Sequence, residues 1–150
     1  MTEISRSEEL SLSGAALRGA PWKAAAVAGG GIAGVSLFMG WVLPGSPSLT
    51  WALGLGISLF ALVAAIGAVA NPQVGDRTTR QARLWSLQHP WKFALLPAGI
   101  TAVLEYPVQL LFDGEGIFDA AWDSLWRGAL VYLIAGIITT AMKGRARSSQ

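Results

Sequence analysis

The chain has 150 residues, of which 53% are hydrophobic and 13% are charged, and its formal net charge is +2. Soluble domains carry about 25% charged residues, so this composition indicates an integral membrane protein instead. A sequence with no cysteine and a single histidine excludes disulfides, thiolate chemistry and a His-cluster metal site.

The polar, serine-rich residues 1–20 predict a flexible N-terminal tail. Four apolar blocks follow, each near the ~20 residues with which an α-helix crosses a bilayer. They cover residues 23–43, 51–70, 91–112 and 125–142, and a basic C-terminal tail follows over residues 144–150. Because backbone polar groups in lipid need partners within their own segment, residues 21–143 predict an all-α domain of four transmembrane helices. The first block is longer than the ~7–15 apolar residues of a cleaved signal peptide, so we expect it to be retained.

Two connections contain expected interfacial helices. The second connection predicts a short helix from about Arg77 to Gln88, which ends before Pro90. Its basic side chains, with that of the next span, are expected at lipid headgroups: Arg77, Arg80, Arg83 and Lys92. The bilayer is thus the expected partner here, and nucleic acid is not. The stretch "GIFDAAWDSLWRG" is amphipathic and predicts an interfacial helix leading into the fourth span.

The distribution of charge predicts the topology. Basic residues occupy the N-terminal tail, the second connection and the C-terminal tail, whereas the first connection is uncharged and the third is acidic. The positive-inside rule therefore places both termini on the cytoplasmic or interior side. The acids of the third connection lack the spacing of an EF-hand, so a solvated rim is expected there and no metal.

The tripeptide Pro-Trp-Lys begins at Pro21 and again at Pro90, in each case just before a span. Each copy is followed by an outer turn and a second span, which suggests two tandem helical hairpins. Alternatively, Trp and Lys simply anchor an inner interface at both places.

Small residues recur four or eight positions apart in the spans and predict close helix packing. The expected packing residues are Gly30 and Gly34, Gly54 and Ser58, and Gly128 and Gly136.

One carboxylate interrupts the third span. Thr101, Glu105 and Gln109 recur at i, i+4 and i+8 and form a polar stripe beside Tyr106. At ~1.5 Å per residue, Glu105 and Arg127 lie about 21 Å and 24 Å from the inner ends of their helices, so they can pair. This pair can be structural, or Glu105 can be a proton or cation site. In a third interpretation, Arg127 reaches the surface to pair with Asp123 and Glu105 stays protonated or meets another chain.

Catalytic motifs such as HExxH, a nucleophile elbow or a phosphate loop are not found in the sequence. We therefore expect a non-enzymatic membrane protein without a cofactor. Its leading function is a structural or accessory subunit of a larger membrane assembly, or a membrane-embedded virion component, packed against copies of itself or another membrane protein. The alternative is a small oligomeric channel or transporter in which Glu105 handles ions or protons.

Overall fold

The computed structural model describes residues 11, 14–43, 48–70, 76–114 and 116–148. Its helices are α2 (Trp22–Val42), α3 (Leu49–Ala70), α4 (Arg77–Gln88), α5 (Pro90–Phe112) and α6 (Ile117–Ser148). Of these, α2, α3, α5 and α6 are long and apolar enough to cross a membrane. The predicted all-α fold with four transmembrane helices is confirmed, and the chain is a multi-pass membrane protein.

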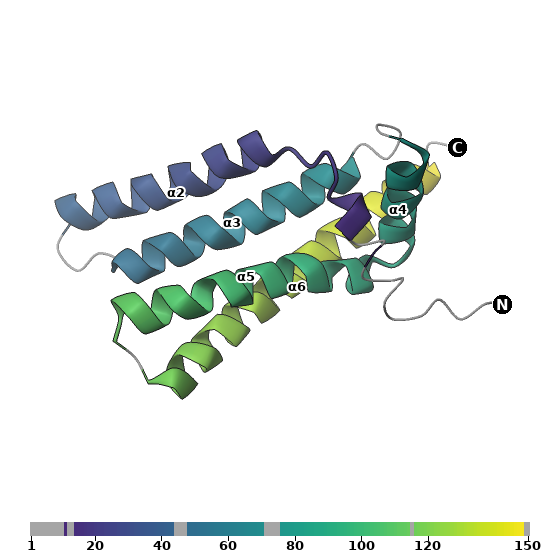
Figure 1. The fold of residues 1–150 in the computed structure, drawn as a ribbon. Coiled ribbons are helices and arrows are strands. Elements are labelled where there is room, and N and C mark those ends of the chain that lie inside the picture. The colour runs from purple at the N-terminus through teal and green to yellow at the C-terminus, as the bar shows by residue number, and fades with distance from the viewer. Residues whose placement is uncertain (1–10, 12–13, 44–47, 71–75, 115, 149–150) are drawn as a thin grey trace.

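The four long helices lie side by side, and α4 lies across one end of them (Figure 1). Helix α2 packs against α3 and α5 against α6, while α3 also contacts α5 and α6 and so joins the two hairpins. The end of α2, the start of α3, the end of α5 and the start of α6 lie at the end of the bundle opposite α4 (Figure 1). This arrangement puts one face of α3 at the centre of the bundle.

Small residues let the helices of each hairpin approach closely. A Cβ atom on Gly56 of α3 would lie 2.8 Å from the carbonyl oxygen of Gly29 on α2. A Cβ atom on Gly128 of α6 would lie 3.1 Å from the carbonyl oxygen of Ala98 on α5. Both hairpins are therefore held at backbone contact by glycines that no larger residue can replace without a shift.

Gly30 and Gly34 of α2 were expected to pack against another helix, but a different face of α2 packs against α3. Cβ atoms added at Gly30 and Gly34 would meet nothing within 4 Å, whereas Gly29 is buried against α3. Ala25 is the other buried residue of α2, so the packed face follows the i, i+4 register of Ala25 and Gly29. The sequence "GGGIAG" supplies glycines on two faces, and periodicity alone does not select between them.

Helix α6 is longer than the expected fourth span. It runs without interruption from Ile117 to Ser148, so the amphipathic stretch before residue 125 is its first part and not a separate helix. No proline lies in this stretch to end a helix. The helix also continues into the basic segment that was expected to be a tail from residue 144.

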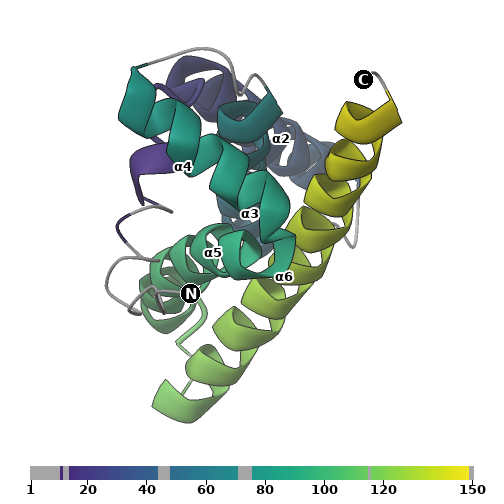
Figure 2. The same cartoon turned by 90° about the vertical axis from the view of Figure 1, so that its right-hand side faces the viewer.

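The end of the molecule at α4 contains a small core that includes part of the N-terminal segment. Ala15 and Ala16 pack in one cluster with residues of α3, α4 and α5, namely Ala65, Val69, Ala82, Leu87 and Phe93. Residues 14–20 thus lie against the bundle, while most of residues 1–13 lie outside the described part. Figure 2, which faces this end, shows α4 lying across it.

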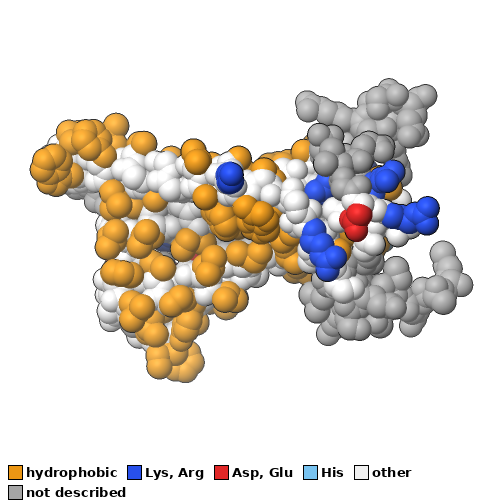
Figure 3. Space-filling view, turned by 45° about the horizontal axis from the view of Figure 1, so that its top comes forward, with side chains coloured by type: hydrophobic (Ala, Val, Ile, Leu, Met, Phe, Trp, Pro, Cys, Tyr) orange, Lys and Arg blue, Asp and Glu red, His pale blue; other side chains and the backbone are white. Residues whose placement is uncertain are grey.

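Basic side chains gather at the α4 end, and apolar side chains cover much of the same face over the spans (Figure 3). Exposed basic residues include Arg77, Arg80 and Lys92. Lys143 near the end of α6 donates a hydrogen bond to the carbonyl of Gln88 at 3.0 Å. The apolar faces suit hydrocarbon, and the basic end suits anionic headgroups.

Candidate functional site

The polar stripe of α5 points into the bundle. Thr101, Glu105 and Gln109 are 0%, 1% and 2% exposed, respectively. Tyr106 lies off this stripe and is half-buried. Since one face of α5 carries all three buried polar side chains, their partners have to come from the helices packed against that face.

Two of those helices supply partners for the Glu105 carboxylate. Ser58 of α3 donates a hydrogen bond to Oε1 of Glu105 at 3.3 Å. Arg127 of α6 places its Nε atom 3.6 Å from Oε2 of Glu105, which forms an ion pair. The Arg127 guanidinium also lies over the Trp51 ring, 5.2 Å from the ring centroid. The site therefore joins α3, α5 and α6 and links the two hairpins.

Gly54 makes the ion pair sterically possible. A Cβ atom at this position would overlap Nη1 of Arg127 and would lie 3.0 Å from Oε1 of Glu105. Gly54 and Ser58 are four residues apart on α3, so they present one face to the carboxylate. We expected these residues to pack helix against helix, and the structure places both beside the charge pair between α3, α5 and α6. The signal in the sequence was their i, i+4 spacing, which does not distinguish the two roles.

Two buried oxygens of the stripe lack hydrogen bonds among the described residues: Oε2 of Glu105 and Oγ1 of Thr101. They lie one helical turn apart on α5. A buried polar atom without a hydrogen bond lowers the free energy of unfolding by about 1–3 kcal/mol. Such atoms are rare in native proteins and are often found at functional sites. The arrangement can hold a proton or a polar ligand beside the ion pair.

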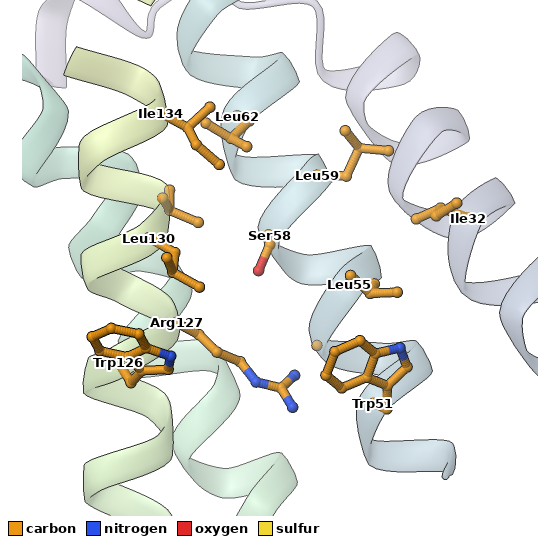
Figure 4. A pocket seen from close by; sticks show the side chains of 12 residues that line it. Ile32, Trp51, Leu55, Ser58, Leu59, Leu62, Trp126, Arg127, Leu130 and Ile134 are labelled. Atoms are coloured by element: carbon orange, nitrogen blue, oxygen red, sulfur yellow. The ribbon is translucent and has the colours of Figure 1, made fainter. Parts of the chain in front are cut away.

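A groove between α3 and α6 reaches the same site from the side of the bundle. It has a volume of about 530 Å³ and is lined mainly by aliphatic side chains of these two helices. Figure 4 shows Arg127 extending across it between Trp126 and Trp51, with Ser58 further along. Trp51, Trp126 and Leu130 are 48%, 61% and 43% exposed, so the groove opens to the surroundings of the bundle.

A second polar contact joins the start of α3 to the end of α5, at the end of the bundle opposite α4. Thr50, at the start of α3, donates a hydrogen bond to Oδ1 of Asp113 at 2.7 Å. No spacing in the sequence indicates this pair, because 63 residues separate the two positions. Among the described residues, no group of three His, Cys, Asp or Glu side chains is placed to hold a metal ion.

Of the side chains expected at lipid headgroups, Arg83 is the exception. It is 3% exposed, and its Nη2 atom donates a hydrogen bond to the carbonyl of Arg18 at 3.1 Å. The expectation of headgroup contact is therefore wrong for Arg83, because α4 turns this side chain toward the N-terminal segment. Trp85 and Leu87 of the same helix are also buried, at 9% and 8% exposed, whereas Leu84 is exposed.

Comparison with protein-family models, with curated proteins and with solved structures finds no match to this chain.

Proposed function

We propose that this protein is a non-enzymatic structural or accessory subunit of a larger membrane assembly, or a membrane-embedded component of a virion. The observation that supports this role is the uncovered small-residue face of α2. Within the described part of the chain α2 buries only Ala25 and Gly29. Cβ atoms at Gly30, Gly31 and Gly34 would meet nothing within 4 Å.

A face of this kind favours contact with another helix over contact with lipid. In a bilayer, helices associate through close backbone approach and van der Waals packing, which small residues permit. Helix α2 sits at the edge of the bundle and packs mainly against α3 among the described elements, so its uncovered face is open to a partner from outside the chain (Figure 1). The partner is a second copy or another membrane protein. Both termini lie on the cytoplasmic or interior side in this proposal, in keeping with the basic α4 end.

Native mass spectrometry after gentle solubilisation from the protein's own membrane tests this role. We expect a fixed stoichiometry with copies of the 15.7 kDa chain or with another protein. The double variant Gly30→Leu, Gly34→Leu should dissociate the complex, because the added side chains block close approach. Gly99→Leu is the matched control, since Gly99 on α5 also faces open space. A monomer in the unaltered protein would overturn the proposal.

The alternative function is a small oligomeric channel or transporter, and the buried Glu105 carboxylate favours it, because its Oε2 atom has the Arg127 ion pair but no hydrogen bond among the described residues. Ionisable groups within spans commonly mark ion or proton pathways. Reconstituted vesicles should then show a saturable proton or cation flux that Glu105→Gln abolishes or alters. A flux of this kind would replace the accessory role as the leading function, and its absence would support that role.

A further inference from the structure

We infer that the groove between α3 and α6 binds a single glycerophospholipid, with the lipid phosphate at Arg127 and one acyl chain along the groove. This inference goes beyond the accessory role, because it uses a different face of the bundle from the glycines of α2. It rests on the position of the Arg127 guanidinium, the free hydrogen-bonding capacity of that group, and the length of the groove.

The tryptophans beside it place the guanidinium within reach of lipid headgroups. Trp51 is the third residue of α3, and the Arg127 side chain lies over its ring. Trp126 flanks the groove on the other side (Figure 4). Tryptophan side chains favour the membrane–water interface, so this end of the groove opens where phosphates lie.

Most of the Arg127 donors are available to a ligand. A guanidinium has five N–H donors, and the Nε atom is the one nearest to Glu105. Nη1 lies against Gly54, and among the described residues no hydrogen bond from either terminal nitrogen is found. The side chain is 20% exposed, so a ligand in the groove can reach it. A phosphate matches this planar fork with two parallel charge-assisted hydrogen bonds, whereas an apolar helix of a partner protein offers it no acceptor.

The rest of the groove suits an acyl chain. From Trp51 to Leu62 it follows eleven residue-to-residue steps of α3, which is about 16 Å at 1.5 Å per residue. One leaflet contributes about half of the ~30 Å hydrocarbon core, so the two lengths agree. Leu55, Leu59 and Leu62 line the groove from α3, and Leu130 and Ile134 line it from α6, while Ile32 of α2 lies on the side of Leu59 (Figure 4). These side chains stabilise a hydrocarbon chain and leave the headgroup at the Arg127 end.

The test compares lipids that share acyl chains. The full-length protein in detergent is titrated with dioleoyl-phosphatidylglycerol, dioleoyl-phosphatidylcholine or dioleoylglycerol, and bound lipid is measured by native mass spectrometry. Both phospholipids should bind about tenfold more tightly than dioleoylglycerol, since each adds charge-assisted hydrogen bonds. Equal binding of dioleoylglycerol would overturn the assignment of the phosphate to Arg127.

Substitutions in the groove give the second arm. Leu130→Trp fills the groove and leaves the ion pair intact, so it should weaken phospholipid binding about tenfold. Leu133→Trp is the matched control, because Leu133 is a similarly exposed leucine of α6 outside the groove, and it should bind as the unaltered protein does. Arg127→Lys keeps the charge without the planar fork and should remove the preference for phospholipid over dioleoylglycerol. Unchanged binding in Leu130→Trp, or cross-linking of another protein's helix to the groove, would overturn the inference.

Discussion

Gly54 of α3 leaves the space that the guanidinium of Arg127 from α6 occupies. A Cβ atom at Gly54 would overlap the Nη1 atom of Arg127. Because Gly54 has no side chain, the α2–α3 hairpin leaves room for the long Arg127 side chain of the α5–α6 hairpin. Glu105 of α5 lies beside both residues. The contact couples helix packing to charge pairing, so that a change at either position should disturb the other.

The first prediction concerns this space. Gly54→Ala should lower the free energy of unfolding by about 1–3 kcal/mol, because an added methyl group overpacks the site and displaces the guanidinium. The measurement is equilibrium unfolding in detergent micelles, followed by circular dichroism. Gly99→Ala is the control, since a Cβ atom there would meet nothing within 4 Å. Equal stabilities of the two variants would contradict the packing seen at Gly54.

The second prediction concerns the ion pair itself. Arg127→Ala should destabilise the fold by about 3 kcal/mol, because it leaves the buried Glu105 carboxyl without its partner. Glu105→Ala should cost less, since Arg127 is 20% exposed and can turn toward the headgroups. The double variant should cost less than the sum by roughly 1 kcal/mol or more. Strict additivity in this cycle would show that the two side chains do not interact.

The sequence predicts most of the fold because lipid imposes a simple requirement on it. Long apolar blocks have to be helices of near-constant length, so three of the four spans agree with α2, α3 and α5 to within two residues. The start of α6 at Ile117 was missed, because an amphipathic first turn and a separate interfacial helix have the same pattern. The bounds of α4 were predicted correctly from its basic, proline-terminated pattern.

The site shows where one-dimensional patterns stop being informative. The stripe of Thr101, Glu105 and Gln109 is visible as a repeat of four, and helix rise alone brings Glu105 and Arg127 to one depth. The third helix of the site was not predicted, because no sequence spacing relates α3 to α5 and α6. The hydrogen bond from Arg83 to the carbonyl of Arg18 was not predicted for the same reason, because the composition of residues 1–20 indicates only a polar tail.

The third prediction is a pH dependence at the start of α4. The Asp76 side chain accepts a hydrogen bond from the Thr79 amide at 3.0 Å and caps the helix. Hydrogen bonds from Thr79, chiefly that of its side chain, lower the pKa of the Asp76 carboxyl below its ordinary value of 3.8. A lowered pKa means that the cap is fully stabilising above pH 3.8 and is lost as the pH falls through the folded-state value.

Carboxyl carbon shifts in nuclear magnetic resonance spectra should give an Asp76 midpoint below 3.8. Asp76→Asn is the control, because asparagine also caps helices but does not titrate in this range. Asp76→Ala should increase hydrogen exchange at the Thr79 amide at every pH. A midpoint at or above 3.8 would contradict the capping contact.

The fourth prediction concerns the packed N-terminal segment. Arg83→Met should make tryptic cleavage after Arg18 about tenfold faster, because the hydrogen bond that holds the Arg18 carbonyl is lost. Fragment masses from limited proteolysis in detergent measure this rate. Arg80→Met, at an exposed position of the same helix, should leave the rate unchanged. Equal rates for the two variants would show that Arg83 does not hold this segment.

The last prediction is the orientation of the bundle. The chain contains no cysteine, so a single introduced cysteine reports its own position without further changes. Asp119→Cys lies near the α5–α6 connection, and Gln81→Cys lies on the exposed side of α4, at the opposite end of the spans (Figure 1). Because Arg18, Arg77 and Arg80 gather at the α4 end, that end should face the cytoplasm. A membrane-impermeant maleimide should therefore label Asp119→Cys in intact cells and Gln81→Cys only after permeabilisation, and the reverse pattern would invert the proposed topology.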